Sequence, residues 1–136
     1  MSRKDTIALI QRYYDAFNAA NTGGMLDCVT DDIEHRVNEG AHRIGRSMFA
    51  EFCAHMGKSH REELKDMIVF ASDDGARAAA EFTVHGTYLT TDPGLPDAKG
   101  QRYILPAGGF FTVQNGKISR ITTFYNLRDW VAQVSA

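Results

Sequence analysis

The sequence has little of several features that would set it apart from an ordinary folded domain. Its 136 residues include two cysteines, three prolines and one tryptophan. No apolar run approaches the roughly 20 residues of a membrane-spanning helix, so we expect no membrane segment. The first residues, MSRKDTIALIQRYY, are interrupted by charges and lack the apolar core of a signal peptide, which favours a cytoplasmic location.

The two cysteines do not form a known motif. Cys28 and Cys53 are not a C-x-x-C pair and have no histidine at metal-binding spacing. Neither has an obvious cationic neighbour that would lower the pKa of its thiol. We therefore expect both to be reduced, buried and small apolar core residues, and not nucleophiles.

Charge of one sign is not in excess either. The formal net charge is -2, and no basic stripe is available to neutralise phosphates, so we expect no nucleic-acid partner. Hydrophobic residues make up 43% and charged residues 24% of the chain, as in globular proteins. This length is enough for one domain with a real core, residues 1–136.

Three helices are predicted in the first half of the chain. Ser2 and Asp5 form a capping box ahead of apolar residues at helical spacing. A short second helix is expected near residues 22–30, and a third over residues 47–58. The apolar face of the third helix would consist of Phe49, Phe52, Cys53 and Met56.

The second half has the pattern of an antiparallel sheet. Runs rich in β-branched and aromatic residues are joined by Asp-Gly and Asn-Gly, which favour hairpin turns because both tolerate positive φ. The predicted strands cover residues 63–71, 76–89, 101–113 and 117–127, and residues 90–100 are expected to form a surface loop.

Helices followed by strands indicate an α+β domain whose helices cover one face of a curved, largely antiparallel sheet. In the strand over 76–89, alternation places Ala78, Ala80, Phe82, Val84, Gly86 and Tyr88 on the core face. In the next strand Tyr103 and Phe111 face the core, but Ile104 and Phe110 make the opposite face apolar too. A second apolar face favours a homodimer formed through the outer face of the sheet.

The segment QRYYDAFNAANTGGMLDCVTDDIEH, the GKI hairpin near the end and the order of the predicted elements resemble one known superfamily. It is the NTF2-like group, which includes nuclear transport factor 2, ketosteroid isomerase-related proteins and SnoaL-like polyketide cyclases. The similarity extends from about Ile7 to Trp130. It implies a cystatin-like cone with three N-terminal helices on the sheet, and a deep pocket between the first helix and the strands.

The resemblance also assigns roles one residue at a time. Ketosteroid isomerases use an Asp base opposite a Tyr and a protonated Asp, which together form an oxyanion hole. Tyr13 occupies the position of the hydrogen-bond donor, but Val37 replaces the base and Gly109 replaces the second acid. With both carboxylates missing, the standard steroid isomerisation is not expected.

The strand that begins near Ile33 supplies another candidate. Alternation turns His35 toward the pocket, while Glu34 and Arg36 point away. Because imidazole titrates near neutral pH, His35 is a candidate general acid or base beside Tyr13. A hydrogen-bonded core histidine fits the same pattern. His35 and His42 lack the spacing of a helical zinc motif, so no metal or other cofactor is predicted.

The predicted pocket is mostly apolar, with several hydroxyl groups and one imidazole. Core filling is the simpler explanation for any single tyrosine, and only their convergence with His35 favours a ligand. The residues predicted to contact a small apolar ligand are Asn38, Phe82, Tyr88, Tyr103, Phe111, Thr123 and Tyr125.

Three functions are compatible with this pattern. The first is metal-free proton transfer, isomerase-like or dehydratase-like, on a small apolar carbonyl compound, with His35 and Tyr13 as the catalytic residues. The second is a binding protein that holds an apolar metabolite unchanged. The third is a structural homodimer with a filled cone. The sequence favours the first by a small margin and does not identify the substrate.

Overall fold

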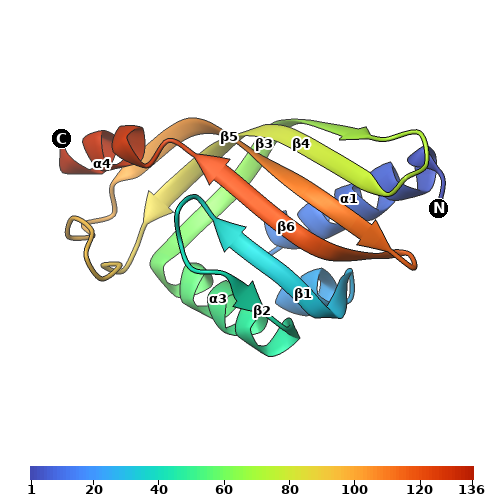
Figure 1. Cartoon of the computed structure of the whole chain (residues 1–136). Coiled ribbons are helices and arrows are strands. Elements are labelled where there is room, and N and C mark those ends of the chain that lie inside the picture. The colour runs from blue at the N-terminus through green and yellow to red at the C-terminus, as the bar shows by residue number, and fades with distance from the viewer.

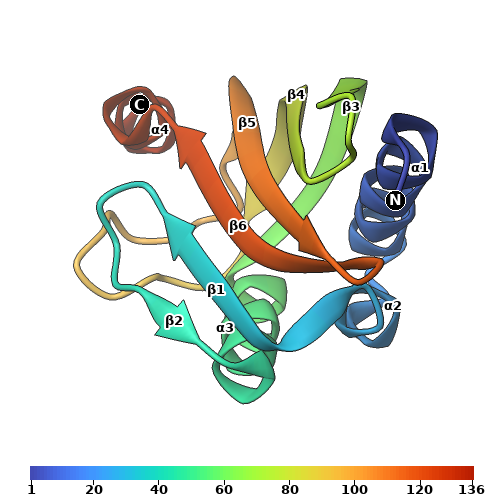
Figure 2. The ribbon, with the colours of Figure 1, turned by 45° about the vertical axis from the view of Figure 1, so that its right-hand side comes forward.

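The computed structural model describes the whole chain, residues 1–136. Its elements are α1 (Arg3–Asn18), α2 (Thr22–Leu26), β1 (Val29–Val37), β2 (Arg43–Ile44), α3 (Arg46–Ser59), β3 (His60–Ala71), β4 (Arg77–Tyr88), β5 (Arg102–Gln114), β6 (Lys117–Tyr125) and α4 (Leu127–Ser135). The strands form one sheet in the order β2-β1-β6-β5-β4-β3. This sheet curves around α1 and α3, and α4 lies at one end (Figure 1; Figure 2). The predicted α+β cone is confirmed.

The first helix begins where the sequence predicts. The Ser2 hydroxyl accepts from the Asp5 backbone N–H at 3.1 Å, and the Asp5 carboxylate accepts from the Ser2 backbone N–H at 3.3 Å, which completes the capping box. The Thr6 hydroxyl donates to the Gly75 carbonyl at 2.6 Å and so ties this end of α1 to the β3–β4 turn. The buried face of the helix consists of Thr6, Leu9, Ile10, Tyr13, Tyr14 and Ala16.

The other two predicted helices are present with shifted ends. The second was expected near residues 22–30, but it ends at Leu26 because Val29 already belongs to β1. The third was expected over 47–58 and occupies Arg46–Ser59. Its first turn has no side-chain cap, since the preceding residue is a glycine.

Both cysteines are free. Cys28 is buried, with 1% of its surface exposed, and Cys53 is half-buried on α3. Burial raises the pKa of the Cys53 thiol to about 11, so this thiol carries its proton at neutral pH and is a poor nucleophile.

The predicted hairpins are present, and β3, β4, β5 and β6 pair antiparallel in sequence. Asn115 and Gly116 have φ values of 52° and 78°, the pair of left-handed residues that this type of two-residue turn requires. The predicted core face of β4, from Ala78 to Tyr88, is buried at every alternate position. Asp66 has φ 55° where the β3–β4 register shifts, so a bulge at this point adds to the curvature of the sheet.

Three features of the fold are absent from the sequence prediction. A two-residue strand, β2, pairs antiparallel with β1 at the edge of the sheet. The strand β1 pairs parallel with β6, so the sheet is not antiparallel throughout. The helix α4 follows β6 directly, where the prediction had continued the strand to residue 127. Asn126 caps α4 by accepting from the Asp129 backbone N–H at 3.0 Å.

The outer face of the sheet carries exposed apolar side chains, as the sequence predicts for β5. Phe110 and Phe124 are about half exposed and their rings meet edge to face at 6.0 Å. Ile68, Phe70 and Ile104 are also about half exposed on the outer surface of their strands. None of the four helices is long and apolar enough to cross a membrane.

Candidate active site at the open end of the cone

Four segments that are far apart in the sequence meet at one end of the sheet. They are α4, the loop over residues 89–101, the β1–β2 turn and the end of α3 that leads into β3. In Figures 1 and 2, the first three lie together at the left of the molecule. The first residues of β3 and β5 and the last residues of β4 and β6 enter this end from the sheet.

Aromatic rings line this end of the inner sheet face. The Trp130 ring from α4 lies 4.9 Å from the Tyr88 ring and 5.8 Å from the Tyr103 ring, in both cases edge to face. The His60 imidazole stacks on the Tyr88 ring at 5.2 Å. All four residues are buried, so polar atoms among them are shielded from water and must find partners within the protein.

The polar atoms of this region form a chain. The Tyr103 hydroxyl donates to Glu62 Oε2 at 2.5 Å, and His60 Nδ1 lies 3.1 Å from the same hydroxyl oxygen. The hydroxyl proton points at Glu62, so the tautomer of His60 that fits this chain carries its proton on Nδ1 and donates to the Tyr103 oxygen. On its other side, His60 Nε2 lies 3.5 Å from Asp92 Oδ2. We call Glu62, Tyr103, His60 and Asp92 the Tyr103 cluster.

A glycine makes the central contact of the cluster geometrically possible. In the sheet, Gly86 of β4 lies between Glu62 of β3 and Tyr103 of β5. A Cβ atom at Gly86 would overlap the Tyr103 ring. The absence of a side chain there allows the ring to lie across β4 and its hydroxyl to reach Glu62.

Burial changes the titration of the carboxyl and phenol groups. It raises the pKa of Glu62, although the Tyr103 hydrogen bond and the nearby His60 partly offset this. Burial also raises the pKa of Tyr103, and the adjacent Glu62 raises it further. For Tyr125 the same two causes come first, followed by Asp92 and Glu39, and raise the pKa to about 12. The tyrosines are therefore neutral hydrogen-bond donors, and Glu62 is a stronger base than an exposed carboxylate.

The loop over residues 89–101 is held against the cluster by Asp92. Its carboxylate accepts from His55 Nε2 on α3 at 3.0 Å while its other oxygen faces His60. Its backbone N–H donates to the Tyr88 hydroxyl at 2.8 Å, and that hydroxyl donates to the Pro96 carbonyl at 2.7 Å. The Tyr88 hydroxyl, predicted to contact a ligand, therefore fastens this loop.

The two predicted catalytic residues lie elsewhere in the core. Tyr13 packs against the rings of Tyr14, Phe49 and Phe111, and burial raises its pKa well above the ordinary value. His35 lies against Phe49, with ring centroids 4.9 Å apart, and its Nδ1 atom has no hydrogen-bond partner. Burial, followed by the charge of Arg43, lowers the pKa of His35 to about 4. Phe49 contacts both residues, but neither one hydrogen-bonds to the Tyr103 cluster, and their catalytic roles stay predictions.

The other predicted ligand contacts divide into structural positions and half-buried positions on β6. Asn38 has φ 50°, and its Oδ1 atom accepts from the Tyr125 backbone N–H at 2.9 Å, so it shapes the end of β1. Phe82 and Phe111 pack against Tyr14 in the core. Thr123 and Tyr125 are half-buried on the inner face of β6, and Tyr125 is close enough to Glu62 and Asp92 for their charges to raise its pKa.

The sequence prediction missed His60, Glu62 and Trp130. It started the strand at residue 63, whereas β3 begins at His60. Continuing the alternation of this strand backward from the buried Leu64 would have placed Glu62 and His60 on the inner face. Gly86, in the middle of a strand, was a second signal, because an isolated strand glycine often marks a close approach of another group.

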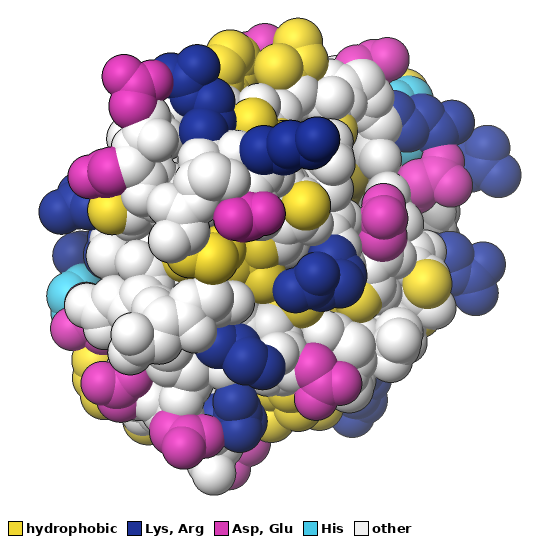
Figure 3. All heavy atoms as spheres, turned by 90° about the vertical axis from the view of Figure 1, so that its right-hand side faces the viewer, with side chains coloured by type: hydrophobic (Ala, Val, Ile, Leu, Met, Phe, Trp, Pro, Cys, Tyr) yellow, Lys and Arg dark blue, Asp and Glu magenta, His cyan; other side chains and the backbone are white.

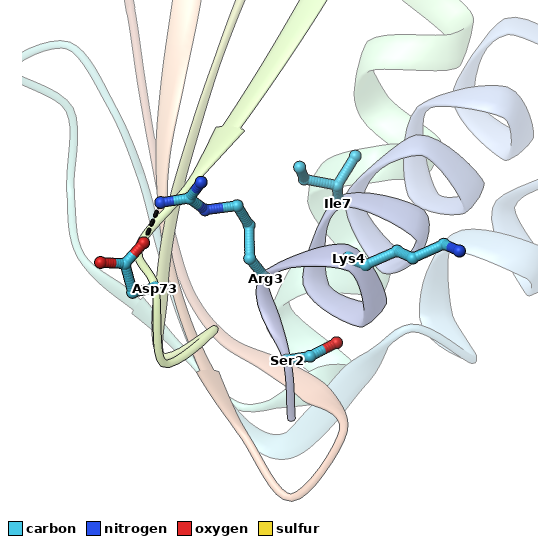
Figure 4. Close-up of a pocket in the computed structure, with 5 residues that line it drawn as sticks. All are labelled: Ser2, Arg3, Lys4, Ile7 and Asp73. Carbon is cyan, nitrogen blue, oxygen red and sulfur yellow. Dashed lines mark hydrogen bonds and ion pairs between the residues drawn. The ribbon is translucent and has the colours of Figure 1, made fainter.

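Two of the hollows on the surface lie beside elements described above. One of about 530 Å³ lies beside the open end of the cone and is lined by Arg36, Asn38, Glu39, Thr122, Phe124, Tyr125 and Leu127. The other, of about 470 Å³, lies where α1 meets the β3–β4 turn, and its lining residues Ser2, Arg3, Lys4, Ile7 and Asp73 include the Arg3–Asp73 ion pair (Figure 4). On the face of the molecule shown in Figure 3, acidic and basic side chains are interspersed.

Comparison with known proteins identifies the family. The SnoaL-like domain matches residues 10–121. The chain belongs to this family. A search of curated proteins finds no match. The Tyr103 cluster of this SnoaL-like chain is built from β3, β5 and the loop over residues 89–101, and not from α1.

Three solved structures are similar to this chain over almost their full length. A proposed polyketide cyclase from a Silicibacter species is 55% identical, with a TM-score of 0.96, and the match covers 100% of this chain and 99% of that one. One from Xanthomonas campestris is 48% identical, with a TM-score of 0.95 and coverage of 98% and 99%. One from Pseudomonas putida is also 48% identical, with a TM-score of 0.94 and coverage of 98% for both chains.

Proposed function

We propose that this SnoaL-like protein is an acid–base enzyme that moves a proton on a small, largely apolar carbonyl compound, without a metal. The hydrogen bond from the Tyr103 hydroxyl to Glu62 carries the proposal. It joins a half-buried carboxylate of raised pKa to a phenol that stays neutral, which is the pairing of base and oxyanion donor that enolisation needs. The sequence pattern favoured His35 and Tyr13 for these roles, which we now propose for Glu62 and Tyr103.

In the proposed step, a substrate carbonyl oxygen takes the Tyr103 hydrogen bond that Glu62 accepts in the free protein. Glu62 then removes a proton from the carbon next to the carbonyl, and the C–H electron pair becomes the enolate double bond. His60 donates to the Tyr103 oxygen and so makes the Tyr103 hydroxyl a stronger hydrogen-bond donor. Asp92 orients His60. Return of the proton from Glu62 to a different carbon completes an isomerisation.

The relatives support a polyketide-like ketone as the first substrate class to test. All three similar structures are of proposed polyketide cyclases, at 48% to 55% identity. Closure of a carbon ring between two ketone groups begins with the same removal of a proton beside a carbonyl. The aromatic wall of Tyr88, Tyr103 and Trp130 suits a flat, apolar substrate.

Proton exchange is the test that needs no knowledge of the product. The purified protein is incubated in D₂O with a panel of 1,3-diketones, steroid ketones and aromatic polyketide-like ketones, and deuterium uptake beside the carbonyl is followed by NMR. We expect Glu62→Gln and Tyr103→Phe each to slow the exchange at least about 100-fold. Glu63→Gln is the matched control, because Glu63 is the next residue but is exposed on the strand.

Two outcomes would contradict the proposal. Exchange that is equally fast in Glu62→Gln and in the wild type would remove Glu62 as the base. Ligand binding without any exchange, with an affinity that does not change with pH, would favour the second candidate, a binding protein. That candidate is supported by the replacement of both ketosteroid isomerase carboxylates, by Val37 and Gly109.

We also propose that two copies pair through the outer face of the sheet. The edge-to-face pair of Phe110 and Phe124, together with exposed Phe70, supports this, since exposed apolar groups of this size favour association. Light scattering after size-exclusion chromatography should give a dimer for the wild type and a monomer for Phe110→Glu. A monomeric wild type at micromolar concentration would contradict the pairing.

A further inference from the structure

A second polar site lies between the edge of the sheet and α3, away from the Tyr103 cluster. Arg43 of the edge strand β2 pairs directly with His35 of β1. Directly opposed residues of an antiparallel pair project from the same face, so both side chains face α3. There they meet one ring, because the Arg43 guanidinium carbon lies 4.3 Å and the His35 ring 4.6 Å from the centre of Phe52. We call His35, Arg43 and Phe52 the His35 slot.

Two nitrogen atoms of the slot have no partner in the chain. His35 Nδ1 and Arg43 Nη1 are both buried and make no hydrogen bond. An unsatisfied buried polar group costs about 1–3 kcal/mol, and these two belong to directly paired residues on one face of the sheet. The His35 residue is only 4% exposed, and bulk water therefore has little access to its ring.

The charge of the slot is also uncompensated. No ion pair involves Arg43, whereas the neighbouring Arg46 is paired with Asp31 at 2.8 Å. A guanidinium has only donors, and neutral imidazole can present a second donor at Nδ1. A suitable partner is thus a negatively charged hydrogen-bond acceptor with two oxygen atoms, such as a carboxylate.

The side chains around these nitrogens indicate the chemistry of the rest of the ligand. The rings of Phe49 and Phe52 both contact His35, so the surroundings of its imidazole are apolar and aromatic. Arg43 is half-buried on the edge strand, so part of its side chain meets solvent. We propose that His35, Arg43 and Phe52 bind a small apolar carboxylic acid. Its carboxylate accepts hydrogen bonds from His35 Nδ1 and Arg43 Nη1, and the apolar part of the acid packs against the phenylalanine rings.

Benzoate is a suitable probe, and its neutral analogue benzamide is the matched ligand control. Benzoate is titrated into the wild-type protein at constant ionic strength, and the ring signals of His35 are followed by NMR. We expect a saturable shift of the His35 signals with benzoate, and none with benzamide or with the same concentration of chloride. The shift should include a rise of the His35 pKa, because the bound anion offsets the charge of Arg43 that helps to lower it.

Variants locate the site. Arg43→Met, which keeps the length of the side chain but removes its charge, should weaken benzoate binding at least tenfold. Arg12→Met removes the same charge from an exposed position on α1 and should leave the affinity unchanged. Tyr103→Phe should also leave it unchanged, so this inference stands or falls independently of the proposed proton transfer.

The ligand series on the wild type decides the question even if Arg43→Met fails to fold. The absence of a saturable shift with benzoate would overturn the proposal, as would equal shifts with benzamide. Inorganic phosphate that binds as tightly as benzoate would overturn the assignment to an apolar acid. Unchanged benzoate affinity in folded Arg43→Met would place the ligand elsewhere.

Discussion

The Tyr103 cluster and the His35 slot each bury a histidine, but the two histidines have opposite surroundings. His60 has a polar group at both ring nitrogens, Tyr103 on one side and Asp92 on the other. His35 is buried to a similar extent among phenylalanine rings, and its Nδ1 has no partner. Burial alone therefore does not define the chemistry of a histidine; the atoms at its two nitrogens do.

The same contrast separates what each region does without a ligand. The Tyr103 cluster is a connected network whose members satisfy one another, so removal of one group leaves others unpaired. In the His35 slot, the charge of Arg43 has no partner in the chain, so its removal leaves no other group unpaired. Four predictions test this difference, beginning with the largest expected effect.

Removal of the aromatic wall of the cluster should have the largest effect on stability. Trp130 is 4% exposed and contacts Tyr88, Tyr103 and His60, so Trp130→Ala leaves a large cavity. We expect it to lower the free energy of unfolding by about 3–5 kcal/mol. Urea denaturation followed by circular dichroism measures this loss. Phe52→Ala is the comparison on the slot side, and because Phe52 is only half-buried, an equal loss there would show that the two walls do not differ.

The titration of His35 should make the protein sensitive to acid. The pKa of His35 is about 4 when folded and 6.5 in the unfolded chain, so between these values the unfolded chain binds more protons. The stability is therefore fully present above pH 6.5 and falls as the pH drops toward 4, by about 3 kcal/mol for this group.

The variant His35→Gln isolates this contribution. Glu62 has the opposite sign, because its raised pKa makes the folded protein bind more protons above pH 4.5. The difference in unfolding free energy between the wild type and His35→Gln, measured by urea titration from pH 7 to pH 4, cancels the Glu62 effect. A difference that stays constant with pH would mean that the folded and unfolded chains hold the His35 proton equally well.

Loss of the central hydroxyl should be costly in the cluster. Tyr103→Phe keeps the ring but leaves the half-buried Glu62 carboxyl and the buried His60 Nδ1 without their shared partner. We expect a loss of about 1–3 kcal/mol in the free energy of unfolding. Tyr125→Phe serves as the control, since the half-buried Tyr125 hydroxyl satisfies neither group. Equal losses in the two variants would argue against a connected network.

Loss of the guanidinium should cost least. Arg43→Met removes a charge that has no partner in the chain and keeps the side chain over Phe52. The expected change in the free energy of unfolding is within about 1 kcal/mol, and it can be a gain. Thermal or urea denaturation in ligand-free buffer measures it. A loss as large as that of Tyr103→Phe would mean that Arg43 is satisfied by ordered water.

Much of the fold follows from local patterns that the sequence contains. The alternation in β4 predicts its buried face because one face of that strand is apolar from Ala78 to Tyr88. Asn115 and Gly116 predict a hairpin because few residues accept positive φ. The capping box of Ser2 and Asp5 likewise involves only neighbours in the chain.

The candidate site depends on contacts that have no local pattern. The boundary between α3 and β3 lies between Ser59 and His60 without a turn residue to mark it, so the local sequence does not reveal that His60 and Glu62 face inward. Asp92 lies close to His60 only because of the path taken by the loop over residues 89–101, which the local sequence does not determine. The helix α4 is short, and its residues Trp130 and Val134 are buried because α4 packs against β5. This contact between distant segments has no signal in the local sequence.

The parallel pairing of β1 with β6 has a consequence for how the chain folds. His35 of β1 pairs with Ile121 of β6, so β1 can join the sheet only after β6, the last strand, has formed. The hairpins β3–β4, β4–β5 and β5–β6 join neighbouring segments and close at little entropic cost, whereas the β1–β6 pairing closes a loop that contains most of the molecule. Such distant contacts slow folding, and the strand that carries His35 is expected to be the last to dock.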